Sequence, residues 1–182
     1  MIDRFGMAWS IRGTLLSLYL ALVLPLPALA PAGLRPALLI AVPIGLLLVL
    51  AISSERVELS ATGLQLRYPA WCNGWLRSGW ELRWEQITGL TPVATSQGGR
   101  VYYVRTTAGR SVLLPQRLEH FGVFLERFTH YTGVDTSAIG RISPAWTYQL
   151  LLGLSASLLL AELAAGWAVL TGRWVFPPNL VV

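Results

Sequence analysis

One carboxylate lies deep inside an apolar stretch near the end of the chain. Glu162 is the only charged residue between Ile142 and Gly172. An ionised carboxylate in hydrocarbon costs about 3 kcal/mol unless it is protonated, paired or in contact with water. We therefore expect Glu162 to form a hydrogen bond or an ion pair that locks this segment to another helix, either of its own chain or of a partner. A proton or ion pathway is the alternative.

Small residues accompany this glutamate at a regular spacing. They recur at every fourth position, so on a helix they form a stripe along which a second helix can approach closely. We expect Glu162 to border this stripe. We also expect the main role of the stripe to be the packing of a second helix. The small-residue stripe consists of Gly153, Ser157, Ala161 and Ala165.

Three arginines flank two predicted hairpins, whose turns are TSQGG and TAGR. Arg100, Arg105 and Arg110 are candidates for contact with an anionic lipid headgroup, because a guanidinium presents several N–H donors to phosphate oxygens. Solvated strand ends are the alternative for Arg105 and Arg110.

Tryptophans are concentrated in WCNGWLRSGWELRW, residues 71–84. Trp80 and Trp84 alternate with charged residues and read as the apolar face of a strand. The preceding loop is rich in Gly, Asn and Pro, and indoles in such a loop favour the membrane interface. We expect this loop to dip into the interface or to dock on a partner membrane protein, and the alternative is that it covers one end of the sheet. The loop residues concerned are Trp71, Trp75, Leu76 and Arg77.

The residues give little support to an enzyme. His120 and His130 lie ten positions apart, which does not place two ligands on one face of a helix, and we expect both to be solvated. No metalloprotease, hydrolase or phosphate-loop motif occurs. Cys72 is the single cysteine, so an internal disulfide is excluded and a buried side chain is expected. We predict no catalysis, no metal and no cofactor.

The composition indicates a membrane protein. The chain has 182 residues, of which 54% are hydrophobic and only 13% charged, well below the share in soluble proteins. Three apolar stretches, 13–34, 36–54 and 142–172, approach or exceed the roughly 20 residues that cross a bilayer. The first could instead be a secretory signal cleaved after Ala30, but Pro31 and the second apolar stretch disfavour cleavage.

The arginines predict an orientation. The chain has a net charge of +5, and all of its positive charge comes from arginine. The arginines are spread along the chain, which argues against a nucleic-acid partner. Most arginines lie in the N-terminal segment or between Glu55 and Arg141. By the positive-inside rule, the N-terminus and the segment between the second and third spans face the cytoplasm.

The segment 55–142 reads as an α+β domain. Apolar residues alternate on both sides of Ala61-Thr62-Gly63, which predicts two strands and a turn. Further alternating segments follow, and then Leu118, Phe121, Leu125 and Phe128 recur at helical spacing up to a stop at Gly133. We predict one antiparallel sheet of about six strands followed by one C-terminal helix, with segments 1–54 and 143–182 forming the membrane part.

This order of elements resembles a known family. Two spans, a strand pair ending in GLQLRYP, a strand followed by WEQITGL, two hairpins and a C-terminal helix are similar to bacterial membrane proteins with a pleckstrin-homology-like (PH-like) domain. The layout is also similar to the photosystem I assembly factors of cyanobacteria and chloroplasts. The run from TSQGGRVYY to HYTGVDT resembles cyanobacterial membrane proteins.

The resemblance implies a non-catalytic scaffold or assembly factor. It implies a location in the thylakoid membrane, with the plasma membrane as the alternative. The implied partners are lipid and a photosynthetic complex or another membrane protein. A lipid-sensing or transport-accessory subunit is the alternative, in which the three arginines bind headgroups or Glu162 titrates.

Overall fold

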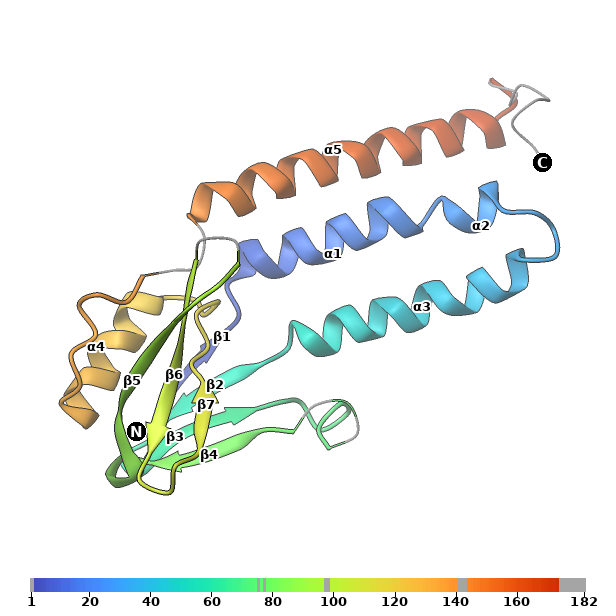
Figure 1. The fold of residues 1–182 in the computed structure, drawn as a ribbon. Coiled ribbons are helices and arrows are strands. Elements are labelled where there is room, and N and C mark those ends of the chain that lie inside the picture. The colour runs from blue at the N-terminus through green and yellow to red at the C-terminus, as the bar shows by residue number, and fades with distance from the viewer. Residues whose placement is uncertain (1, 75, 77, 97–98, 141–143, 174–182) are drawn as a thin grey trace. The chain divides into compact units, whose positions relative to one another are not determined.

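The protein was analysed as a computed structural model that describes residues 2–74, 76, 78–96, 99–140 and 144–173. The chain divides into two compact units (Figure 1). The sheet unit consists of Met1–Trp9 and Ser54–Pro144, and the helical unit of Ser10–Ser53 and Ala145–Val182. The first nine residues therefore belong with the sheets, whereas the sequence had placed them with the first two spans.

The sheet unit contains two antiparallel sheets in its described part, in place of the single six-stranded sheet that was predicted. The first sheet has the order β1 (Asp3–Gly6), β2 (Arg56–Leu59), β3 (Gly63–Arg67) and β4 (Trp80–Arg83). The second has the order β5 (Ile87–Ala94), β6 (Arg100–Thr106) and β7 (Ser111–Leu113). A 3-10 turn, Trp84–Gln86, separates β4 from β5. It interrupts the extended backbone, so the chain passes from one sheet to the other.

Helix α4 (Phe121–Thr132) supplies much of the core of the sheet unit. Phe121, Leu125 and Phe128 are buried, which confirms the predicted apolar face, and Phe124 on the same helix is buried as well. Phe124 meets Phe5 of β1 edge-to-face, with ring centroids 5.6 Å apart. The helix ends at Gly133, whose left-handed φ of 69° confirms the predicted stop.

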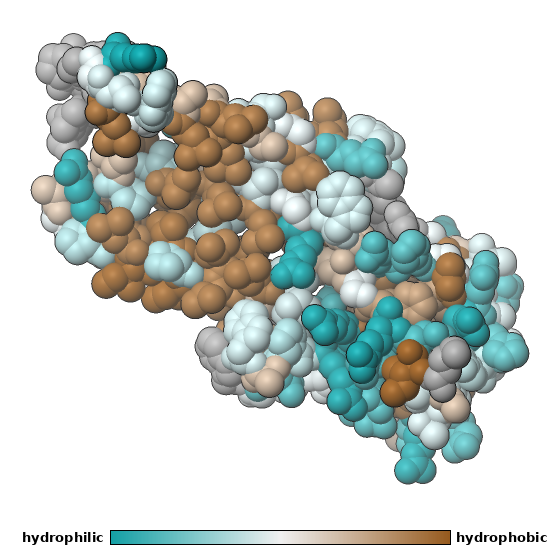
Figure 2. Space-filling view, turned by 180° about the vertical axis from the view of Figure 1, so that it is seen from behind, coloured by the Kyte–Doolittle hydropathy of each residue, from teal (hydrophilic) through white to brown (hydrophobic). Residues whose placement is uncertain are grey.

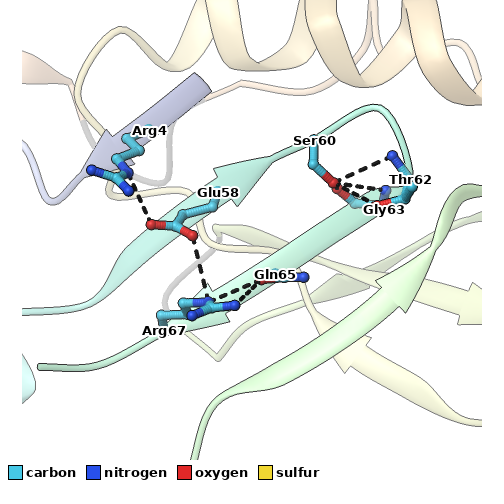
Figure 3. A network of polar contacts seen from close by, with 7 residues as sticks. All are labelled: Arg4, Glu58, Ser60, Thr62, Gly63, Gln65 and Arg67. Atoms are coloured by element: carbon cyan, nitrogen blue, oxygen red, sulfur yellow. Dashed lines mark hydrogen bonds and ion pairs between the residues drawn. The ribbon is translucent and has the colours of Figure 1, made fainter. Parts of the chain in front are cut away.

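A polar network ties the N-terminal strand to its sheet (Figure 3). Arg4 on β1 lies opposite Glu58 on β2, and their side chains form an ion pair of 3.0 Å. Arg67 on β3 pairs with the other oxygen of Glu58 at 3.4 Å and donates to the Gln65 side chain. Both arginines are largely exposed, so each ion pair contributes at most about 1 kcal/mol. The network chiefly fixes the register of β1.

The turn between β2 and β3 forms where the sequence predicts it. The Ser60 hydroxyl accepts hydrogen bonds from the backbone N–H groups of Thr62 and Gly63, as Figure 3 also shows. Gly63 cannot carry a side chain here, because a Cβ would collide with the backbone carbonyl of Leu82 on β4.

The helical unit contains three helices that are long and apolar enough to span a membrane, among the described residues. These segments are Trp9–Leu29, Arg35–Ile52 and Trp146–Leu170, which confirms the predicted number and shifts the predicted limits by a few residues. The first segment consists of two helices separated by a break. The elements are α1 (Trp9–Val23), α2 (Leu26–Leu29), α3 (Arg35–Ile52) and α5 (Ala145–Leu170).

The surface of the helical unit is strongly apolar. At most 11% of each candidate span is buried inside the chain, and large side chains such as Ile40, Leu154 and Leu160 are exposed. Figure 2 shows hydrophobic residues gathered over these helices, whereas polar residues predominate on the sheet unit. An apolar surface of this extent needs lipid or another protein to cover it.

Candidate functional site on helix α5

Helix α5 contacts α1 through a short series of polar side chains. The Thr14 hydroxyl donates to the Tyr148 carbonyl at 2.8 Å, and the hydroxyls of Ser17 and Ser155 lie 2.6 Å apart. Thr14 and Ser155 are only 3% and 4% exposed. Hydroxyl groups buried between apolar helices in this way stabilise a specific register. This contact was not predicted from the sequence, although serines inside apolar segments are the signal that could have revealed it.

On its other side α1 contacts α3, so it lies between α3 and α5 (Figure 1). The Tyr19 hydroxyl donates to the Val42 carbonyl at 2.7 Å. Gly45 makes room for this ring, because a Cβ there would collide with Tyr19.

The small-residue stripe of α5 is not used in packing within the described chain. Gly153, Ser157 and Ala161 are exposed, and Ala165 is half-buried. No atom outside the helix backbone comes within 4 Å of a Cβ built on Gly153. The contact with α1 uses Tyr148 and Ser155 instead. The stripe is therefore available to a helix from elsewhere.

Glu162 lies on a different side of α5 from the one expected. It follows Gly153 by nine residues, about two and a half turns, which places the two on opposite sides of the helix. It follows Ser155 by seven residues, about two turns, so Glu162 shares the side that faces α1. Glu162 therefore borders only the end of the stripe formed by Ala161 and Ala165, and not the whole stripe as expected.

The carboxyl group of Glu162 has no protein partner in the described part of the chain. Its Oε2 atom is buried and makes no hydrogen bond, and no ion pair involves either oxygen. The expected lock to its own hairpin is therefore not formed among these residues. A lock to a partner's helix stays a prediction.

The tryptophan loop is partly described. Trp71 is 47% exposed and Leu76 is half-buried, whereas Trp75 and Arg77 lie outside the described residues. Cys72 is fully buried, as expected, with its sulfur 3.5 Å from the Pro69 carbonyl oxygen. On the next strand, β4, Trp80 is half-buried, Leu82 is buried and the charged residues between and after them are exposed. Trp84, which was expected on the same strand, is buried in the 3-10 turn that follows it.

The three arginines do not form one cluster. Arg100 and Arg105 lie at opposite ends of β6, five residues or about 17 Å apart. Arg110 follows the turn after β6, and its carbonyl accepts a hydrogen bond from Thr106. All three side chains are exposed, and none forms an ion pair with a described residue. The hairpin thus brings only Arg105 and Arg110 to the same end of the sheet.

Other polar residues form local structure. His120 and His130 are both exposed, as expected. No group of three or more His, Cys, Asp or Glu side chains in the described ranges could hold a metal ion. After α4, the backbone N–H and the hydroxyl of Ser137 donate to Asp135, and these two hydrogen bonds lower the pKa of its carboxyl group.

Comparison with known proteins gives one informative relative. The chain is 37% identical over 182 residues to a protein of the cyanobacterium Synechocystis sp. that bears the name "Uncharacterized protein slr0269". The match covers 97% of this chain and 89% of the relative. No protein family description and no solved structure matches. With this identity over nearly its whole length, the chain belongs to the family of this cyanobacterial protein.

Proposed function

We propose that the protein is a non-catalytic integral membrane scaffold or assembly factor that binds another membrane protein through the small-residue stripe of α5. The main support for this proposal is that most of the stripe is exposed. Gly153, Ser157 and Ala161 are exposed on a side of α5 away from the contact with α1. Small residues in an apolar helix allow close approach of a second helix, and no helix among the described residues packs on this stripe.

The sheet unit supports the same proposal. Two antiparallel sheets of four and three strands, with helix α4 after the last strand, support the PH-like domain that we propose, in which β1 comes from before the apolar helices. Such a domain on the cytoplasmic side gives the protein a second surface for a partner. The cyanobacterial relative makes a thylakoid membrane and a photosynthetic complex our proposed setting.

Site-specific photo-crosslinking in native membranes tests this function. A crosslinking amino acid at Ser157 is expected to yield an adduct with a second, different protein. The same amino acid at Gly166 is the control, because Gly166 lies on the same helix, is equally exposed and points away from the stripe. Equal adducts from both positions, or an adduct only with a second copy of the chain, would contradict the proposal.

A lipid-sensing function is the second candidate, and the exposed pair Arg105 and Arg110 favours it. Binding of the protein to anionic lipid through this hairpin would weaken as salt is raised. Reconstituted full-length protein would then recruit added anionic vesicles, and replacing both arginines by alanine would abolish recruitment, whereas Arg100→Ala would not. Equal recruitment by all three proteins would exclude this hairpin as a headgroup site.

A further inference from the structure

The first apolar segment is broken opposite α5. Helix α1 ends at Val23 and α2 begins at Leu26. Pro25 lies between the two helices, and Pro27 is the second residue of α2. A proline has no N–H group, so it cannot donate to the carbonyl four residues earlier. The carbonyls of Ala21 and Val23 therefore lose the donors that a continuous helix would supply.

Hydrogen bonds define the helix ends on both sides of the break. The Leu24 N–H donates to the Leu20 carbonyl, while the N–H groups of Ala28 and Leu29 both donate to the Pro25 carbonyl. Ala21 is 2% exposed, so its carbonyl lies inside the helical unit. In an apolar medium such a carbonyl needs a partner. The two carbonyls that lose their helical donors to the prolines, hereafter the break carbonyls, belong to Ala21 and Val23.

Glu162 lies at the level of this break. Helices α1 and α5 run side by side in the same direction, since Thr14 bonds to Tyr148 and Ser17 to Ser155. Seven residues beyond Ser17 is Leu24, and seven beyond Ser155 is Glu162. Because both helices rise by about 1.5 Å per residue, the two positions stay level. Figure 1 shows the break between α1 and α2 alongside α5.

The unpartnered carboxyl oxygen and the carbonyls that the prolines deprive of their helical donors thus lie at the same level. Glu162 shares the side of α5 that Ser155 presents to α1, and its buried Oε2 has no hydrogen bond. All the groups that meet here are oxygen acceptors, so they cannot satisfy one another. An ion or a proton between them would satisfy both.

No described cation of the chain supplies that charge. The charged residues in the helical unit besides Glu162 are Arg12, Arg35 and Arg173, and the ionisable hydroxyls belong to Tyr19 and Tyr148. Arg12 lies in the first turn of α1, far from the break. Arg35 donates to the Ala30 carbonyl, and the Arg173 guanidinium lies 4.9 Å from the centre of the Trp167 ring. The Tyr19 hydroxyl donates toward α3.

We propose that Glu162 and the break carbonyls form a binding site for one monovalent cation, either a proton or an alkali ion. Carboxylate and carbonyl oxygens are ligands suited to hard cations. One carboxylate balances a single positive charge, whereas a divalent ion would leave an uncompensated charge in an apolar medium. A bound proton would be donated to a break carbonyl, and a bound alkali ion would be coordinated by both kinds of oxygen.

Infrared spectroscopy of the full chain in phosphatidylcholine vesicles tests this site, because it observes the carboxyl group directly. Bands that disappear in Glu162→Gln are assigned to Glu162. A protonated carboxyl band would identify a proton as the ligand. A carboxylate band that moves when sodium chloride replaces tetramethylammonium chloride would identify an alkali ion. A carboxylate band that responds to neither pH nor sodium would overturn the proposal.

A second variant tests the contribution of the break. Pro25→Ala supplies an N–H group that can bond to the Ala21 carbonyl, so the Glu162 band is expected to shift. Pro43→Ala is the matched control, because Pro43 also lies inside an apolar helix but on α3, with α1 between it and α5. A Glu162 band that is the same in Pro25→Ala as in the unmodified protein would exclude the break carbonyls from the site.

Discussion

Single glycines set the closest approaches in this molecule. Gly63 on β3 lies against the backbone of Leu82, and backbone atoms cannot move aside as a flexible side chain can. We predict that Gly63→Ala lowers the free energy of unfolding of the sheet unit by about 1–3 kcal/mol, as overpacking does. Urea unfolding in mild detergent, followed by near-ultraviolet circular dichroism, measures the change. Gly6→Ala is the control, since a Cβ on Gly6 of the neighbouring strand pair meets nothing within 4 Å. Equal stability of the two variants would contradict the assigned register.

Asp135 provides a prediction about pH. Hydrogen bonds from the backbone N–H and the hydroxyl of Ser137 lower its pKa in the folded protein. A lowered folded pKa means that the associated stability is present above the unfolded pKa, and it is lost as the pH falls through the folded value. We predict that Ser137→Ala raises the pKa of Asp135 only part of the way to its ordinary value, because the stronger backbone bond remains. Titration of the carboxyl carbon by NMR measures this, and no change in the variant would contradict the hydroxyl contact.

Helices α1 and α3 contact each other where the Tyr19 ring on α1 packs against Gly45 on α3. Gly45→Ala would force the Tyr19 side chain to move, so we predict a loss of about 1–3 kcal/mol in the stability of the helical unit. The penalty should disappear in a Tyr19→Ala background, because the obstacle is then absent. Thermal unfolding in detergent of the two single variants and the double variant measures this coupling. Additive effects would show that Gly45 and Tyr19 do not touch.

The sequence predicts the elements with local signals and misses those that depend on distant pairing. Helix α4 and its stop at Gly133 follow from spacing and from one residue type, and both are confirmed. Strand β1 has only four residues beside an apolar segment, and its pairing with β2 brings together positions at least fifty residues apart. No local pattern could reveal that pairing, or the division into two sheets at Trp84–Gln86.

The candidate site shows the same limit. Regular spacing predicts the small-residue stripe, but spacing does not say which side of α5 meets α1. The Ser17–Ser155 contact decides that question, and it places Glu162 toward α1. The relation of Glu162 to the break at Pro25 emerges only when two helices are set in register.

At the level of the whole molecule, the helical unit has two distinct sides of α5 with separate tasks. The side toward α1 maintains the fold and carries Glu162. The opposite side, with Gly153, Ser157 and Ala161, remains exposed in the described chain and is proposed to receive a partner. The proposed partner site and the proposed cation site therefore lie on different sides of α5 and can be tested independently. Loss of the partner would leave the infrared bands of Glu162 unchanged.

Purification of the tagged chain from native membranes in a gentle detergent tests the scaffold function. A native gel with mass spectrometry of each band is expected to find it in a stoichiometric complex with another membrane protein. Gly153→Leu should release it from that complex, whereas Gly166→Leu, the same exchange on the other side of α5, should not. Migration of the unmodified protein as a small species without a partner would contradict the scaffold function.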